Sequence, residues 1–159
     1  MSYLKIENLE ISFKTSKGKF IAVKDINLDI EKGQIVSIIG HSGCGKSTIM
    51  NAIAGMTFPS KGSVLLNGKT IKGPGPDRGI VFQNYSLLPW LSVYQNVFQA
   101  VDAAVKDKTI QQKHEVVEKY LKMVNLWEHK EKLPQQISGG MKQRVAIARA
   151  FAIDPAVLL

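Results

Sequence analysis

The feature that most constrains this chain is a glycine-rich stretch that matches the pattern G-x-x-x-x-G-K-[ST] at residues 40–48. It follows the apolar run 35–39, predicted to be a buried strand, and precedes a predicted helix that begins near Lys46 and stops at Gly55. Three glycines allow the backbone to curl so that successive N–H groups point at one anion, and the helix N-terminus adds its positive dipole end. The stretch is therefore predicted to bind the phosphates of a nucleotide.

The side chains of this phosphate loop (residues 40–48) have separate predicted roles. Lys46 places a cation at the β- and γ-phosphates, Ser47 offers a hydroxyl to Mg²⁺, and Thr48 assists at the α-phosphate side. A glycine-rich turn that binds nothing is the alternative. The predicted nucleotide-binding residues are Gly40, His41, Ser42, Gly43, Cys44, Gly45, Lys46, Ser47 and Thr48.

Cys44 is the only cysteine of the chain, so no internal disulfide can form, which fits a reducing cytosol. It lies beside Lys46 and a predicted helix N-terminus, and both favour the thiolate. Alkylation at Cys44 is therefore expected to block nucleotide binding. A small residue that fills the loop, with incidental reactivity, is the alternative.

A second candidate phosphate site begins at Ser138. This residue is a good N-cap, and Gly139 and Gly140 leave the first helical N–H groups open to an oxyanion. The helix that follows has apolar residues at Val145, Ala148 and Phe151, so an ordinary N-cap before an amphipathic helix is the alternative.

With the phosphate loop and the run Ile137-Ser138-Gly139-Gly140-Met141, the chain resembles the ATP-binding subunit of ABC transporters, whose signature is L-S-G-G-Q followed by a basic helix. The resemblance implies ATP and Mg²⁺ as cofactors, Lys46 and Gln83 as catalytic residues, and Gln83 as a contact of Mg²⁺ or the attacking water. It also implies that an aromatic residue stacks on adenine, with Phe13 at the family's position and Phe20 as the alternative. Ser138, Gly139 and Gly140 then serve the nucleotide bound by a partner subunit.

Residues 39–44, 75–78 and 81–91 are similar to those of the nitrate, cyanate and bicarbonate uptake ATPases of bacteria, with taurine and sulfonate importers close behind. His41 is the most nitrate-like detail. The resemblance implies MgATP hydrolysis that drives import of a small oxyanion, most of all nitrate or nitrite. A soluble ABC ATPase that transports nothing is the alternative from another class.

The same resemblance implies the partners and the location. The expected partners are integral membrane permease subunits, a second ATP-binding subunit in a homo- or heterodimer, and indirectly a solute-binding protein. The expected place is the cytoplasmic face of the bacterial inner membrane. The apolar loop Pro89-Trp90-Leu91 is expected to receive a permease helix, unless Trp90 packs inside its own domain.

The expected fold class is α/β, a P-loop core of the ABC ATPase type with an antiparallel β-subdomain and a helical insertion. Residues 1–86 are expected to form the β-subdomain and phosphate-loop core, 87–137 the helical subdomain, and 138–159 the signature helix and the start of the Walker B strand. The chain stops before that strand's two carboxylates, which predicts an N-terminal fragment of a longer subunit. Apolar alternation predicts strands over 4–30, Asn67-Gly68 predicts a type I′ hairpin, and helices are predicted at 93–105 and 109–126.

The net charge of +8 raises the question of nucleic-acid binding. The lysines of 106–132 alternate with acids and lack interleaved aromatic residues, so a solvated surface is expected, with weak attraction to anionic lipid as the alternative. No nucleic-acid partner is therefore expected.

Overall fold

The computed structural model describes residues 2–16 and 18–159. The chain forms two compact units, Met1–Gly75 and Pro76–Leu159. The finer predicted division into 1–86, 87–137 and 138–159 stays a prediction. Among the described residues, no helix has both the length and the apolar character that a bilayer crossing requires.

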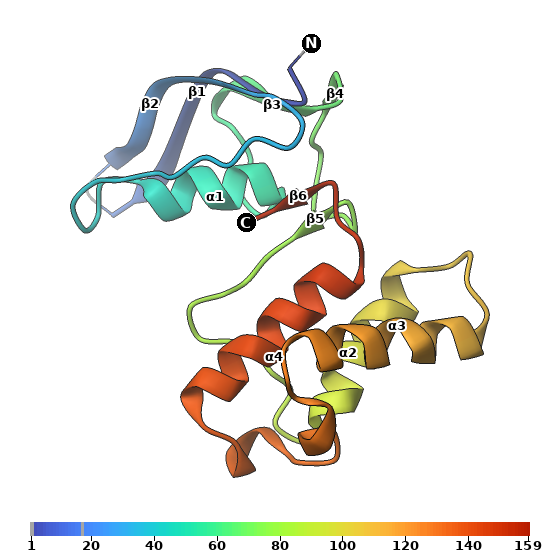
Figure 1. Cartoon of the computed structure of the whole chain (residues 1–159). Coiled ribbons are helices and arrows are strands. Elements are labelled where there is room, and N and C mark those ends of the chain that lie inside the picture. Colours follow the sequence, from blue (N-terminus) through green and yellow to red (C-terminus); the bar gives the residue numbers. More distant parts are fainter. Residues whose placement is uncertain (1, 17) are drawn as a thin grey trace. The chain divides into compact units, whose positions relative to one another are not determined.

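The first unit is an antiparallel sheet with one helix along one of its faces (Figure 1). Its strands are β1 (Leu4–Thr15), β2 (Gly18–Ile30), β3 (Lys61–Leu66) and β4 (Lys69–Thr70), in the order β2-β1-β3-β4. The predicted strands of residues 4–30 are confirmed. Leu4, Ile6, Leu9 and Ile11 of β1 are all buried, at 2% exposure or less.

Local signals of the first unit are confirmed as well. Helix α1 (Lys46–Ala54) ends at Gly55, which has a φ of 77° and donates its N–H to Ala52 O at 3.0 Å. Asn67 and Gly68 join β3 to β4 with φ values of 50° and 73°. Two positive φ values in a two-residue connection are what a type I′ turn requires.

The buried strand expected at residues 35–39 is not observed, so this prediction is wrong for the described residues. No strand is assigned there, and the side chains of Ile35 and Ile39 are 92% and 93% exposed. A strand needs a hydrogen-bonded neighbour, and neither sheet of the described residues pairs with this segment. Its apolar sequence indicates a buried strand, but the described residues supply neither the partner nor the cover.

The second unit packs three helices together and carries a small parallel sheet (Figure 1). The helices are α2 (Val93–Ala104), α3 (Ile110–Met123) and α4 (Gly139–Ala152), with short 3₁₀ turns η1 (Trp127–His129) and η2 (Pro134–Gln136). Strand β5 (Arg78–Gly79) pairs in parallel with β6 (Val157–Leu158). The predicted helices of 93–105 and 109–126 are thus confirmed, each slightly shorter than expected.

Capping and burial explain why α2 and α3 form where they do. Ser92 with Gln95 and Thr109 with Gln112 make capping boxes at the two N-termini. The core between the helices consists of apolar side chains with no exposure, Val93, Val97, Val101, Val117, Leu121, Leu126 and Val145.

Two details of the second unit differ from expectation. The apolar sequence of residues 79–83 predicts a short strand, but a strand is assigned only at Arg78–Gly79, although Val81 N still donates to Leu159 O at 2.8 Å. Phe151, expected on the apolar side of α4 with Val145 and Ala148, is 45% exposed. In both cases the described residues provide no further strand or side chains to cover the segment.

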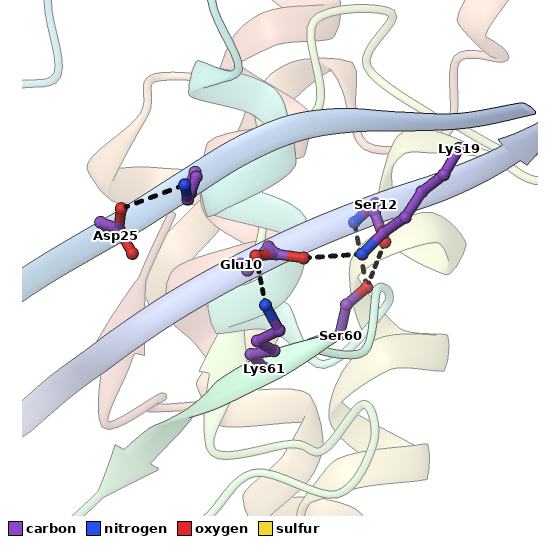
Figure 2. Close-up of polar contacts among 7 residues, drawn as sticks. Glu10, Ser12, Lys19, Asp25, Ser60 and Lys61 are labelled. Carbon is purple, nitrogen blue, oxygen red and sulfur yellow. Dashed lines mark hydrogen bonds and ion pairs between the residues drawn. The ribbon is translucent and has the colours of Figure 1, made fainter.

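A buried carboxylate connects three parts of the first sheet. Glu10 of β1 is 4% exposed and accepts hydrogen bonds from Lys19 at 2.9 Å and Lys61 at 3.1 Å, which reach it from β2 and β3 (Figure 2). The hydrogen bond from Lys19, and then that from Lys61, lowers the pKa of Glu10 below its ordinary value, while desolvation opposes the change. Figure 2 also shows the Ser12 and Ser60 hydroxyls paired beside this group, 2.8 Å apart.

Replacing Glu10 with glutamine is expected to lower the thermal unfolding midpoint at pH 7. The lowered pKa means that Glu10 stabilises the fold fully above its unfolded-state pKa, and that this contribution disappears as the pH falls through the folded-state pKa. The difference in thermal unfolding midpoint between Glu10→Gln and wild type should therefore shrink below about pH 4.5, near the unperturbed carboxyl pKa. Calorimetry of the full-length protein between pH 3 and pH 7 measures it.

Asp25→Asn is the matched control. Asp25, labelled in Figure 2, lies 3.9 Å from Lys24 in an exposed ion pair, and such pairs contribute little to stability. Asparagine also suits the left-handed backbone at this position, where φ is 54°. Equal midpoint shifts in the two variants, or a Glu10→Gln shift that does not change with pH, would contradict the account.

Candidate nucleotide-binding site

The phosphate loop lies in the first unit, where it follows segment 35–39 and includes the first three residues of α1. The Lys46 ammonium folds back over it and donates to Gly40 O and to His41 O, both at 2.8 Å. Its distance to the Cys44 sulfur is 3.7 Å. The predicted cation is thus held against the loop backbone, and residues 40–44 are all exposed to solvent.

Gly45 explains how the loop turns into the helix. It is the N-cap of α1 with a φ of 99°, a left-handed conformation that residues with a Cβ rarely adopt. A Cβ at this position would lie 2.4 Å from Val23 Cγ1 and 3.0 Å from Ala22 O. Only glycine therefore allows the loop to approach β2 this closely.

The first turn of α1 leaves its donors available to an anion. Within the described part of the chain, no side chain caps the α1 N-terminus, and the first turn contains no acidic residue. The first N–H groups of a helix have no partner inside the helix, and they carry the positive end of its dipole. Together with the Lys46 ammonium, they form an uncompensated positive site of the kind that binds phosphate.

Hard oxygen ligands for Mg²⁺ are present but few. Ser47 is exposed in the first turn of α1, and Thr48 beside it is half-buried. The described residues contain no group of three or more His, Cys, Asp or Glu side chains that could hold a metal ion. Mg²⁺ usually keeps several waters and takes one or two protein ligands together with the phosphates.

His41 and the two aromatic candidates are also in the first unit. His41 Nδ1 lies 2.9 Å from Ser42 O, and its ring is exposed. Phe13 and Phe20 face each other across the β1–β2 pair and are 44% and 57% exposed. Phe13 is therefore not a core residue, and either ring has an open face for stacking.

The signature residues lie in the second unit, at the start of α4. Ser138 is the N-cap, as predicted, and its Oγ accepts from Met141 N at 3.3 Å. Its O–H proton remains available to a ligand because a hydroxyl both accepts and donates. Gly139 and Gly140 follow in the exposed first turn.

Gln83 also belongs to the second unit and is exposed after the end of β5. Sequence reasoning missed Arg149, whose guanidinium donates to the carbonyls of Tyr85 and Ser86 just after Gln83. The one available signal was an arginine among the small apolar residues 146–152 of α4. That pattern does not indicate what the arginine contacts.

Comparison with known proteins identifies the family. A family model described as "ABC transporter" matches residues 23–159. The bicarbonate transport ATP-binding protein CmpC of Synechocystis sp. is 52% identical over 99% of this chain and 24% of its own length. CmpD of the same organism is 49% identical over 99% of this chain and 56% of its own length. The nitrate import ATP-binding protein NrtD of Synechococcus elongatus is 49% identical over 93% of this chain and 54% of its own length. The chain thus spans about half or less of the length of these curated relatives.

Solved structures agree. The dimeric bacterial ABC transporter cassette MJ0796 is similar with a TM-score of 0.86 and 32% identity over 98% of this chain and 72% of its own. CbiO1 from Clostridium perfringens is similar with a TM-score of 0.81 and 32% identity, over 99% of this chain and 64% of its own. The expected α/β fold of an ABC ATPase cassette is therefore confirmed. Since the family model also covers both the phosphate loop and the signature, this chain belongs to the ABC transporter family of ATP-binding proteins.

Proposed function

We propose that the protein is the ATP-binding subunit of an importer, in which hydrolysis of MgATP at the phosphate loop drives uptake of a small oxyanion. The observation that carries this proposal is the geometry of the loop. The Lys46 ammonium lies 2.8 Å from two loop carbonyls, and Gly45 starts a helix whose first N–H groups no described side chain caps. A triphosphate requires this convergence of cation and backbone donors.

Within this proposal each motif has its own task. The backbone N–H groups of residues 40–48 surround the phosphates, Lys46 neutralises the β- and γ-phosphates, and Thr48 contacts the α-phosphate side. Bound Mg²⁺ would be held by Ser47 and Gln83, and it would supply charge neutralisation on the phosphate oxygens. Gln83 would orient the attacking water because a neutral amide can do so without adding charge. Ser138, Gly139 and Gly140 would close the nucleotide of the partner subunit.

Phe13 is proposed to stack on the adenine ring. It lies two residues beyond buried Ile11 on β1, with a register shift of the β1–β2 pair between Ile11 and Ser12. Ile11 pairs with Val23, and Val23 is the residue against which Gly45 packs. The open ring of Phe13 therefore lies two residues along β1 from the pair that adjoins the phosphate loop. Phe20, its cross-strand neighbour, remains the alternative.

Nitrate or nitrite is the first candidate substrate, from the resemblance of residues 39–44. Bicarbonate is the second, and it is favoured by the relatives CmpC and CmpD, which are bicarbonate transport ATP-binding proteins. Nitrate, nitrite and bicarbonate are small planar oxyanions, and the ATP-binding subunit does not need to contact the transported anion. The proposed class of substrate is therefore a small anion, with cyanate and sulfonates or taurine as further members.

The expected partners are permease subunits, a second ATP-binding subunit and, indirectly, a solute-binding protein, at the cytoplasmic face of the bacterial inner membrane. The docking loop is supported by Trp90, which is 69% exposed and so does not pack inside its own unit. Buried Asn96 holds this loop in shape, since it accepts from Leu88 N at 2.8 Å and donates to Leu91 O at 2.9 Å. An apolar side chain presented on a fixed loop suits a protein partner better than solvent.

Tracer uptake tests the substrate. The full-length subunit is expressed with its permease and solute-binding protein in cells that lack their own importers for nitrate and bicarbonate. Labelled nitrate should accumulate with the wild-type subunit and fall to background with Lys46→Ala. Uptake of bicarbonate instead of nitrate would establish the second candidate. Lys46-independent uptake of both anions would contradict the proposed function.

A further inference from the structure

The loop that follows Gln83 has an unfavourable backbone conformation. Tyr85 and Ser86 are consecutive non-glycine residues with φ values of 62° and 46°. The left-handed region costs free energy for any residue with a Cβ, so neighbouring contacts must hold such residues in place. Within the loop, Ser86 N donates to Asn84 O at 2.7 Å, which closes a tight turn but leaves the carbonyls of Tyr85 and Ser86 for other partners.

Arg149 of α4 binds both of these carbonyls. Its Nη1 donates to Ser86 O at 2.6 Å and its Nη2 to Tyr85 O at 2.9 Å. Burial lowers the pKa of Arg149, but a guanidinium stays protonated in proteins. The planar fork of arginine matches two adjacent acceptors, whereas a lysine ammonium is a single point of donation.

Tyr85 also extends from this loop to the other end of α4. A Cβ built on Gly139, the first residue of the helix, would lie 3.4 Å from the Tyr85 hydroxyl. Gly139 and Arg149 are ten residues apart, roughly 15 Å along a continuous helix. The loop after Gln83 is therefore hydrogen-bonded to α4 at Arg149 and lies beside the first residue of the helix, Gly139.

We propose that Arg149 is a positioning residue for Gln83. By holding Tyr85 and Ser86 in their left-handed conformation, it fixes the chain direction immediately after Gln83. Through α4 it also makes the Gln83 loop and the signature residues Ser138 and Gly139 move as one body. The inference rests on the proposed function, in which Gln83 acts on the γ-phosphate. It assigns to Arg149 a role in turnover rather than in nucleotide binding, which belongs to the phosphate loop.

The kinetics of ATP hydrolysis by the full-length subunit with its permease test this role. Arg149→Gln should lower kcat roughly tenfold or more, the usual range for loss of hydrogen bonds from a charged group, with KM for ATP changed by less than about twofold. Arg149→Lys keeps one charged donor and should recover part of kcat. Arg144→Gln is the matched control, because Arg144 on the same helix donates to a carbonyl, that of Val124 at 2.9 Å, which is not in the Gln83 loop. Its kcat should stay within about twofold of wild type.

A double-mutant cycle separates positioning from general stability. If Arg149 acts through Gln83, adding Arg149→Gln to Gln83→Ala should lower kcat by less than about twofold further. The proposal would be overturned if the kcat losses of the two single variants multiply in the double variant. It would also be overturned if Arg149→Gln and Arg144→Gln lowered kcat equally. Where Arg149→Gln fails to assemble with the permease, the same comparison is made with Arg149→Lys.

Hydrogen exchange distinguishes failure of this inference from failure of the proposed function. The amides of residues 84–86 should exchange faster in Arg149→Gln than in wild type, and no faster in Arg144→Gln. Unchanged exchange in Arg149→Gln would overturn the inference whatever the activity. A wild-type protein with no Lys46-dependent hydrolysis would overturn the proposed function, and with it the role of Arg149 in turnover.

Discussion

Replacing Lys46 with alanine is expected to abolish ATP hydrolysis and import by the full-length subunit while leaving its assembly with the permease intact. The Lys46 ammonium is the one side-chain cation that contacts the phosphate-loop backbone among the described residues, at 2.8 Å from Gly40 O and His41 O. Removing a cation that stabilises charge on the transferred phosphoryl group costs on the order of 10²- to 10³-fold in turnover. Phosphate release and tracer uptake measure the loss.

Assembly should survive because Lys46 belongs to the first unit, whereas the proposed docking loop around Trp90 belongs to the second. Lys69→Ala is the control, since Lys69 is an exposed lysine on β4 of the same unit as Lys46. Its turnover should equal that of wild type. Turnover of Lys46→Ala within about tenfold of wild type, or loss of permease co-purification in this variant, would contradict the account.

Ser138→Arg is expected to leave ATP binding by a single subunit unchanged and to prevent ATP-dependent dimer closure and hydrolysis, with a loss of turnover of about 100-fold or more. Ser138 caps α4, and Gly139 and Gly140 leave the exposed first turn without side chains. A long cation at this helix start would fill the space that a partner's triphosphate needs. Thr109→Arg is the control for loss of a helix cap, because Thr109 caps α3 in the same way.

Mixing two damaged subunits tests whether the signature serves the partner's nucleotide. A dimer of one Lys46→Ala subunit and one Ser138→Arg subunit has one site with both motifs intact and one site with both damaged. ATP-dependent crosslinking across the intact site should be recovered in mixed dimers. Full turnover by Ser138→Arg alone would refute the arrangement, and mixed dimers that form without recovered crosslinking would count against it.

The elements predicted correctly from the sequence are those whose causes are local. Gly55 ends α1, Asn67-Gly68 makes the turn between β3 and β4, and Ser138 caps α4, each through contacts within about four residues. Backbone conformation at such positions depends on the residue itself and its chain neighbours. The predicted phosphate loop has the same local basis, since all the donors that it would offer lie within nine consecutive residues.

The features that the sequence did not predict depend on distant partners. The run 35–39 has the composition of a buried strand, but a strand forms only where another strand pairs with it. Arg149 contacts carbonyls 63 and 64 positions away, and nothing near it in the sequence identifies them. Glu10 is buried by Lys19 and Lys61, of which the second is 51 residues distant. Residue type alone would have placed this glutamate on the surface.

The central claim is that residues 40–48 bind the phosphates of ATP, and equilibrium binding of MgATP tests it most directly. Titration calorimetry compares the wild-type full-length subunit with Lys46→Ala and Lys69→Ala. The account predicts saturable binding by wild type and Lys69→Ala, and an affinity lower by about tenfold or more in Lys46→Ala, because that variant lacks the charge-assisted contact to the phosphates. Equal affinities in wild type and Lys46→Ala, or no binding by the wild type, would contradict it.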